Sequence, residues 1–112
     1  MDLVLGAVSD LMFSVRIGDA ARRARKRAVF VGTFERLTAQ LENNPSLVIV
    51  DLACAGTEPV RAIREAKQRG IKVIAFGAHV DVESLKAARE AGADKVLPRS
   101  KFVEQLEQLI TE

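Results

Sequence analysis

The stretch Leu47-Val48-Ile49-Val50-Asp51 decides the fold of this chain. It contains four consecutive apolar residues, three of them β-branched, and it ends in a carboxylate. A continuous apolar run without polar alternation is typical of a central parallel strand, because helices cover such a strand on both faces. Ligands of open α/β sheets bind beyond the carboxyl ends of the strands, so Asp51 stands where a functional acid is expected.

Four further runs have strand character, and helical patterns separate them from one another. Together with residues 47–51, the expected strands are residues 3–8, 28–31, 72–76 and 95–97. Five strands that alternate with five helices predict an α/β fold, because right-handed crossovers place parallel strands between two helical layers. We expect a flavodoxin-like three-layer (βα)5 sandwich with a five-stranded parallel sheet in the order 2-1-3-4-5.

Hydroxyl and carboxyl side chains stand where helices are expected to begin, and glycines stand where two of them end. Such side chains accept hydrogen bonds from free backbone N–H groups, and glycine tolerates the left-handed conformation after a helix. The expected N-caps are Thr33, Thr57, Asp81 and Ser100, and the expected terminators are Gly70 and Gly92. Val60 and Val82 are expected to face the core in the helices that follow Thr57 and Asp81.

Length and composition favour one ordinary globular domain over residues 1–112, without a second domain. The chain has 48% hydrophobic and 29% charged residues, and its formal net charge is only +2. This charge is too small to imply a nucleic-acid partner by itself. No signal peptide or long apolar run is present and Cys54 is the only cysteine, so we expect a cytoplasmic protein without a membrane span or a disulfide.

Three stretches carry a specific pattern: residues 45–52 (PSLVIVDL), 71–76 (IKVIAF) and 91–99 (AGADKVLPR). They closely resemble response-regulator receiver domains, the CheY-like family of two-component signal transduction. The resemblance is strong from about residue 41 to residue 102, whereas the first forty residues fit only in their order of strands and helices. It implies a stand-alone receiver-like domain, without an output domain, whose phosphoacceptor position is Asp51.

The chain departs from the family at the other positions of the site. The family has two acids after the first strand, where this chain has only Asp10. Gly77 stands at the position of a serine or threonine, Val96 at that of an aromatic residue, and Arg99 at that of a lysine. Asp51 with Asp10 is a poor set of ligands for Mg²⁺, which prefers several hard oxygen donors. The resemblance therefore favours a degenerate receiver without a cofactor.

Three functions remain open. The leading hypothesis is a pseudo-receiver, a signalling or regulatory protein-interaction module that is not an enzyme and lacks normal phosphotransfer. By family resemblance, a protein partner or a second copy would dock on the face formed by the helix after Asp81, the strand at residues 95–97 and the last helix. The first alternative is an active response-regulator receiver, phosphorylated on Asp51 with Mg²⁺ held by Asp10 and Asp51. The second alternative is a small basic nucleic-acid-binding module.

Three residues near Asp51 have both a functional and a structural interpretation. Arg99 is expected to form a bidentate pair with Asp51, or else to be a solvated surface arginine. His79 follows the fourth strand and joins the crevice as a base, ligand or pH-sensitive group, or is an ordinary loop histidine. Cys54 lies three residues after Asp51, and an inert thiol is the favoured interpretation.

The basic cluster is the only concentration of charge, and it comprises Arg22, Arg23, Arg25, Lys26 and Arg27. Such a cluster can bind nucleic acid, a membrane surface or an acidic partner. It also ends the first helix, where the helix dipole favours cations. At 100° per residue its charges spread around the exposed arc, so the sequence favours a solvated helix end and makes nucleic acid an improbable partner.

Overall fold

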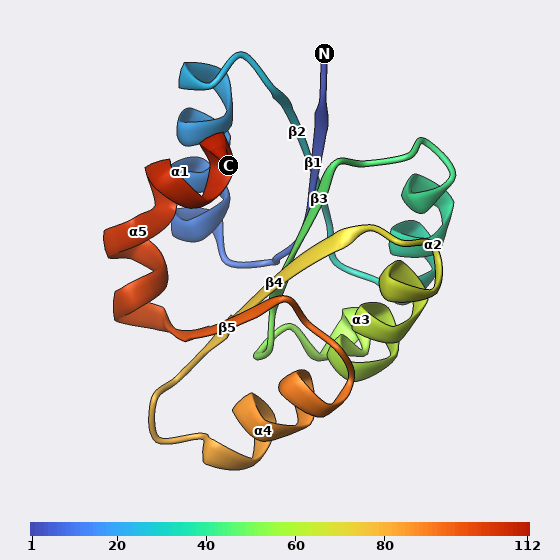
Figure 1. Ribbon diagram of the computed structural model, residues 1–112, viewed down its shortest axis with the longest axis vertical. Helices are drawn as coiled ribbons and strands as arrows, with labels where there is room; N and C mark the ends of the chain where they lie inside the picture. The colour runs from blue at the N-terminus through green and yellow to red at the C-terminus, as the bar shows by residue number, and fades with distance from the viewer.

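Five parallel strands form one sheet in the order β2-β1-β3-β4-β5 (Figure 1). The structure is a computed structural model that describes residues 1–112. The strands are β1 (Leu3–Ala7), β2 (Arg27–Val31), β3 (Leu47–Asp51), β4 (Lys72–Gly77) and β5 (Lys95–Pro98). The helices are α1 (Leu11–Arg23), α2 (Phe34–Leu41), α3 (Pro59–Gln68), α4 (Val82–Glu90) and α5 (Arg99–Thr111). The expected flavodoxin-like architecture and strand order are confirmed.

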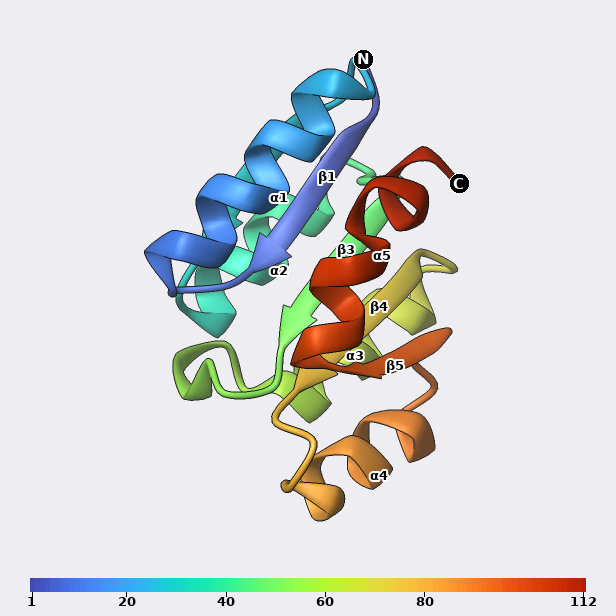
Figure 2. The ribbon, with the colours of Figure 1, turned by 90° about the vertical axis from the view of Figure 1, so that its left-hand side faces the viewer.

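The helices form two layers around the sheet. Figure 1 shows α1 and α5 on one side of the strands and α2 and α3 on the other, and Figure 2 shows α1 and α5 from the front. Each face of the sheet has its own apolar core, one with α2, α3 and α4 and the other with α1 and α5. The five helices therefore complete the three layers expected from the sequence.

The β3 strand shows why its sequence is a continuous apolar run. Val48 and Val50 belong to the core under α2 and α3, whereas Leu47 and Ile49 belong to the core under α1 and α5. Successive side chains of a strand point to opposite faces, so a central strand covered on both faces has no position for a solvated residue. All five residues of β3 are buried, including Asp51.

Two of the four expected N-caps are confirmed. The Thr33 side chain accepts a hydrogen bond from the Arg36 N–H at 3.2 Å, and Asp81 accepts one from the Ser84 N–H at 3.2 Å. Gly70 and Gly92 have φ of +73° and +103°, the left-handed conformation expected of helix terminators.

The other two expected N-caps are wrong. Thr57 is buried in a short 3₁₀ turn, Ala55–Thr57, and its hydroxyl donates to the Cys54 carbonyl at 2.8 Å. The α3 helix begins two residues later at Pro59, because the fixed φ of proline suits the first helical position. Ser100 lies inside α5, which begins at Arg99 after Pro98.

The helix faces also differ in part from those expected. Val82 is 66% exposed, so it does not face the core, and Val60 is only partly buried. Leu85 and Ala88 are the buried residues of α4. None of the helices combines the length and the apolar character that crossing a membrane requires.

Candidate functional site

Asp51 ends β3 at the edge of the sheet where the loops β1–α1, β3–α3 and β4–α4 begin. Asp51 is only 4% exposed, which is unusual for a residue with a carboxylate. The Oδ1 atom accepts a hydrogen bond from the Ala53 N–H at 2.9 Å. The Cys54 N–H donates to the Asp51 carbonyl at 3.0 Å. These bonds turn the chain sharply and hold the carboxylate at the strand end.

Arg99 is the cation that lies nearest to Asp51. Its Nη2 atom is 3.8 Å from the Asp51 Oδ1 atom, within the range of an ion pair but too long for a hydrogen bond. The Arg99 guanidinium also lies 5.7 Å from the centre of the Phe13 ring, and its side chain is 39% exposed. The structure therefore brings Arg99 to Asp51 as expected, but not in the bidentate geometry.

Three phenylalanines pack together on the α1–α5 side of this site. The Phe76 and Phe102 rings stack with centres 4.3 Å apart, and Phe13 stacks on Phe76 at 4.9 Å. They come from α1, β4 and α5, so this cluster joins three elements that are distant in sequence. Stacked aromatic pairs of this kind add to the stability gained by burial. The sequence alone identifies each residue as apolar but does not indicate that they meet beside Arg99.

Asp10 has a structural role at the start of α1. It is the N-cap residue, and its Oδ1 atom accepts a hydrogen bond from the Phe13 N–H at 3.1 Å. Its negative charge is close enough to act on Asp51, where it raises the pKa of that carboxyl. The structure therefore places Asp10 in the crevice predicted from the sequence, although its side chain already caps a helix.

Burial raises the pKa of Asp51 above the ordinary carboxyl value. The hydrogen bond from Ala53 and the positive charge of Arg99 act in the opposite direction, and Asp10 adds to the increase. The net direction is upward, so the fold disfavours the ionised form of Asp51. Arg99 thus compensates the charge of Asp51 only in part.

Leu52 covers the position at which the family has a hydroxyl. Gly77 is the last residue of β4, and a Cβ atom added to it would lie 3.2 Å from the Leu52 Cδ1 atom and 3.3 Å from the Leu52 Cβ atom. Such distances are shorter than normal van der Waals contact, so the leucine already occupies this space. The sequence did not reveal this contact, because the direction of a side chain beyond a strand end depends on the loop.

The residues present do not fit the Mg²⁺ ion that the fold family implies. Nowhere in the molecule do three His, Cys, Asp or Glu side chains gather closely enough to hold a metal ion. Asp51 and Asp10 are the only acids of the crevice, and each already accepts a backbone N–H. Arg99 further supplies a positive charge beside Asp51, which disfavours the binding of a second cation there. Mg²⁺ requires several oxygen donors in an octahedral arrangement.

None of the remaining candidates forms a side-chain hydrogen bond or an ion pair with Asp51. His79 is exposed in the loop between β4 and α4, and its side chain has no hydrogen bond to the protein. Cys54 is buried and has no second cysteine. Val96 is half-buried in β5.

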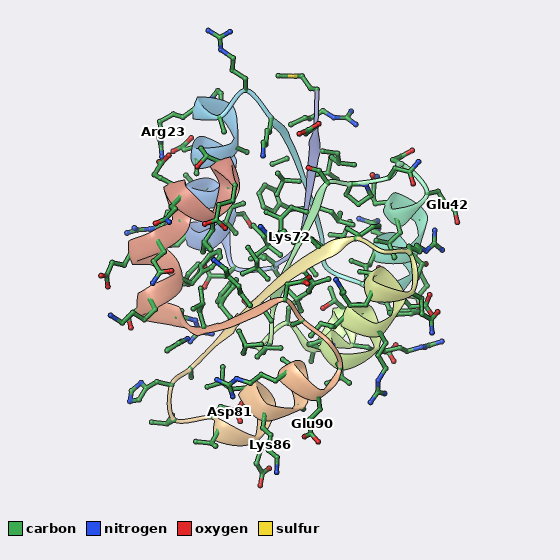
Figure 3. The ribbon with its side chains drawn as sticks, viewed as in Figure 1. Arg23, Glu42, Lys72, Asp81, Lys86 and Glu90 are labelled. Carbon is green, nitrogen blue, oxygen red and sulfur yellow. The ribbon has the colours of Figure 1, made fainter.

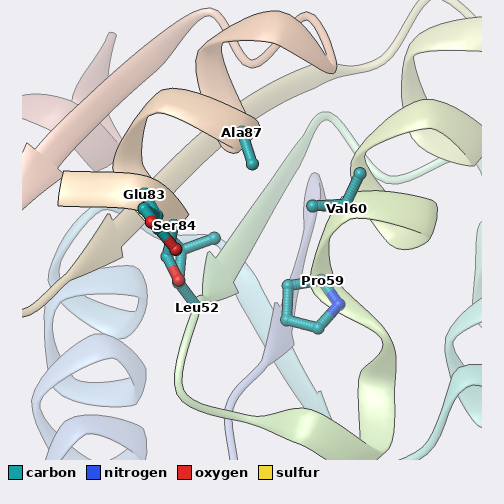
Figure 4. A pocket seen from close by; sticks show the side chains of 6 residues that line it. All are labelled: Leu52, Pro59, Val60, Glu83, Ser84 and Ala87. Atoms are coloured by element: carbon teal, nitrogen blue, oxygen red, sulfur yellow. The ribbon is translucent and has the colours of Figure 1, made fainter. Parts of the chain in front are cut away.

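The Leu52 side chain also lines a cavity of about 310 Å³ between α3 and α4, together with Pro59 and Ser84 (Figure 4).

Three members of the basic cluster contact acceptors on α1 or α5. Arg22 pairs with Asp19, and Arg23 pairs with Glu107 of α5 (Arg23 is labelled in Figure 3). The Lys26 Nζ atom donates to the Ile110 carbonyl at 2.6 Å, at the end of α5 where carbonyls lack helical partners. Arg25 has a left-handed φ of 59°, and Arg27 begins β2. Two of these charges, Arg23 and Lys26, therefore connect the end of α1 to α5.

Comparisons with known proteins find no matching family model and no matching curated protein. Solved structures do match over the whole chain. A response regulator from Hahella chejuensis has a TM-score of 0.85 at 15% identity, covering 99% of this chain and 93% of its own. The receiver domain of the response regulator TorR has a TM-score of 0.82 at 13% identity, covering 98% and 97%. A response regulator from Thermotoga maritima has a TM-score of 0.77 at 18% identity, covering 100% and 99%.

These matches establish the fold of this chain as that of response-regulator receiver (CheY-like) domains. At identities of 13–18% these matches show the fold alone, and a fold does not determine function, so the activity has to be argued from the crevice itself.

Proposed function

We propose that the chain is a pseudo-receiver, a signalling module that acts through protein contacts and does not transfer a phosphoryl group to Asp51. One observation carries this proposal: Asp51 faces a guanidinium and a single further acid, Asp10, where a metal-assisted phosphoacceptor needs several oxygen ligands. The receiver fold supports a role in signalling only by analogy, because one fold hosts many functions.

The chemistry of phosphoryl transfer supports the same proposal. An aspartate attacks phosphorus as the carboxylate, and cations must neutralise the charge on the incoming phosphoryl oxygens. The fold disfavours the ionised form of Asp51. Position 77 has no hydroxyl to contact those oxygens, and Leu52 packs where a side chain at this position would begin. The crevice is therefore poorly suited both to activate Asp51 and to hold a phosphoryl group.

The proposed contact surface is the α4-β5-α5 face, on which a regulatory partner or a second copy would dock. The β5 strand is an edge of the sheet, and Val80 and Val82 at the start of α4 are 75% and 66% exposed. Figure 3 shows Lys86 and Glu90 projecting from α4, so the apolar tip has charged neighbours of both signs. Apolar residues inside a charged rim are the usual composition of a transient protein interface.

The test of phosphotransfer is intact-mass spectrometry after incubation with acetyl phosphate and millimolar Mg²⁺. We expect no change in the mass of the wild-type chain. A quadruple variant, Ser9→Asp with Leu52→Ala, Gly77→Ser and Arg99→Lys, restores an acid, a hydroxyl and an ammonium and shortens the leucine that packs on position 77. It serves as the positive control and should gain one phosphoryl group. A gain of mass by the wild type that Asp51→Asn abolishes would establish the alternative, an active receiver.

The test of the contact surface is sedimentation at increasing concentration. If the α4-β5-α5 face joins two copies, Val82→Glu should abolish the increase in mass with concentration. Met12→Glu is the matched control, because Met12 is 66% exposed, as Val82 is, but lies on α1. An unchanged monomeric mass in the wild type would exclude self-association and leave a different protein as the partner.

A further inference from the structure

A groove of about 440 Å³ runs between α1 and β2, at the edge of the sheet opposite to β5. Its apolar lining comes from the side chains of Met1, Val15, Ala28 and Phe30, together with Gly18. The Phe30 ring packs against the glycines, because a Cβ atom at Gly6 would lie 2.6 Å from it and one at Gly18 would lie 3.8 Å from it. The two glycines thus let the ring lie flat between β1 and α1 as the floor of the groove.

The backbone of β2 is open beside this groove. The Arg27 N–H donates to the Asp2 carbonyl at 2.9 Å, so the backbone groups of Arg27 face β1. Hydrogen-bonding directions alternate along a strand, and β2 pairs only with β1. The N–H and C=O groups of Ala28 and Phe30 therefore point to the side that no strand covers. An uncovered edge of this kind can accept an additional strand.

The groove has one charged end and one apolar end. Arg22, Lys26 and Arg27 line it near the start of β2, where Asp19 is the single acid. Toward the other end of β2, Val15 is 53% exposed, and Leu11, one helical turn away on the same side of α1, is 76% exposed. The excess of cations at the first end complements carboxylates, and the second end complements apolar side chains.

We propose that this groove binds an extended segment of a partner protein, which adds to β2 as a sixth strand. The segment carries carboxylates at the end near Arg22 and Arg27 and apolar residues at the end near Val15. Ala28 and Phe30 supply main-chain hydrogen bonds, and the groove receives every second side chain of the segment. The proposal rests on the proposed function in one respect, that the chain acts through protein contacts.

Charge distinguishes this occupant from a second copy of the chain. Two copies joined by a two-fold axis through β2 would run antiparallel, so the basic end of each groove would lie against the apolar end of the other and would meet no carboxylate there. The apolar floor of Phe30 and Val15 likewise offers nothing to a phosphate backbone. An acidic and apolar segment matches both ends of the groove.

The test begins with a phage-displayed library of random peptides, selected on the immobilised full chain. Enriched peptides should carry acidic residues toward one end and apolar residues at alternate positions toward the other. A synthetic copy of an enriched peptide is then titrated against the chain by calorimetry. When it binds, the amide hydrogens of Ala28 and Phe30 should exchange more slowly, which a side-chain contact alone would not cause.

Two variants address the main chain and the charge separately. Ala28→Pro removes an outward N–H without breaking the bonds to β1, and it should weaken peptide binding at least about tenfold. Arg27→Glu reverses the charge at the rim and should weaken binding by a similar factor, about tenfold. Arg64→Glu is the matched control on α3, across the sheet, and it should leave binding unchanged. Thermal melting of each variant verifies that it is folded.

Three results would overturn the proposal. They are the absence of enriched peptides, binding that neither variant weakens, and a dimer of the wild type that Ala28→Pro dissociates. None of them affects the proposed function of the Asp51 crevice, which the phosphodonor experiment tests without the groove. Conversely, phosphorylation of Asp51 would refute the pseudo-receiver and leave the binding of a peptide at β2 intact.

Discussion

Two carboxylates at opposite ends of the sheet have opposite electrostatic environments. Asp51 follows β3 at the carboxyl ends of the strands, and Asp94 precedes β5 at their amino ends. The Asp94 Oδ2 atom accepts hydrogen bonds from the Lys67 Nζ atom and the Val73 N–H, both at 2.8 Å. Partial burial acts to raise the pKa of Asp94, but Lys67 and Val73 outweigh it and lower the pKa. The pKa of Asp51 is instead raised by burial.

The difference indicates which end of the fold is built for stability. At the amino ends, ion pairs and hydrogen bonds compensate the charged side chains. Glu112 is a second example, because Lys72 and Lys95 both form ion pairs with it. At the carboxyl ends, a carboxylate remains buried with incomplete compensation. Carboxylates with a perturbed pKa are more frequent at functional sites than elsewhere, which is the reason to test Asp51 by mutation.

The largest expected effect comes from the close packing of loops at the carboxyl ends of the strands. A Cβ atom added at Gly56 would overlap the Gly32 carbonyl oxygen, a backbone atom that cannot simply rotate away. Gly56→Ala should therefore destabilise the fold by about 1–3 kcal/mol in urea denaturation. Gly32→Ala is the control, because a Cβ atom there meets nothing within 4 Å, and its effect should stay within about 0.5 kcal/mol. If Gly56→Ala and Gly32→Ala changed the free energy of unfolding equally, the loops that carry Gly32 and Gly56 would have to move apart at little cost.

The second prediction tests the stabilising end of the comparison. Asp94→Asn removes the Lys67 ion pair and weakens the bond to the Val73 N–H, and it should cost about 1 kcal/mol at neutral pH. This estimate is modest because the Asp94 side chain is 40% exposed. The control is Glu104→Gln, whose ion pair with Lys101 spans 3.7 Å between two exposed side chains and should contribute almost nothing.

The pH dependence of this effect has a defined sign. A lowered pKa means that the folded state favours the ionised carboxylate, so the contribution of Asp94 is present at neutral pH. It is lost as the pH falls below the ordinary carboxyl value and through the lowered pKa. Wild type and Asp94→Asn should therefore converge in stability in acid. A difference that persists in acid would attribute the effect to packing.

The sequence predicted the architecture well, for reasons that particular residues make clear. Runs such as residues 47–51 are apolar on both faces only in a covered parallel strand, and Thr33 and Asp81 are recognisable caps. Thr57 and Ser100 were predicted wrongly as N-caps, because a hydroxyl residue near a helix start can equally lie in a turn or inside the helix. Pro59 and Pro98, which determine where α3 and α5 begin, were the better signals.

The site was predictable in its position but not in its energetics. Parallel strands align their carboxyl ends, so Asp51, Asp10 and Arg99 were expected to meet there. The balance between burial of Asp51 and its pairing with Arg99 depends on one distance, 3.8 Å, that no spacing in the sequence encodes. The same holds for Leu52, whose packing on Gly77 follows from the path of a loop.

The smallest expected effect tests Asp51 itself. Because burial raises its pKa, the folded state binds a proton more tightly than the unfolded state does, and ionisation therefore destabilises the fold. At neutral pH, Asp51→Asn should stabilise the protein by less than about 1 kcal/mol, because an amide removes the buried charge and its oxygen still accepts the Ala53 N–H. A bidentate pair with Arg99 would give the opposite sign.

The pH dependence of Asp51→Asn mirrors that of Asp94→Asn. As the pH rises from the ordinary carboxyl pKa through the raised pKa of Asp51, ionisation of Asp51 lowers the free energy of unfolding of the wild type. The stability advantage of Asp51→Asn should therefore grow over that pH interval and vanish below it. Urea denaturation at a series of pH values measures this difference. Asn has nearly the shape of Asp, so the comparison isolates charge. If Asp51→Asn instead destabilises the protein at neutral pH, Arg99 compensates Asp51 fully, and the two ends of the sheet are electrostatically alike.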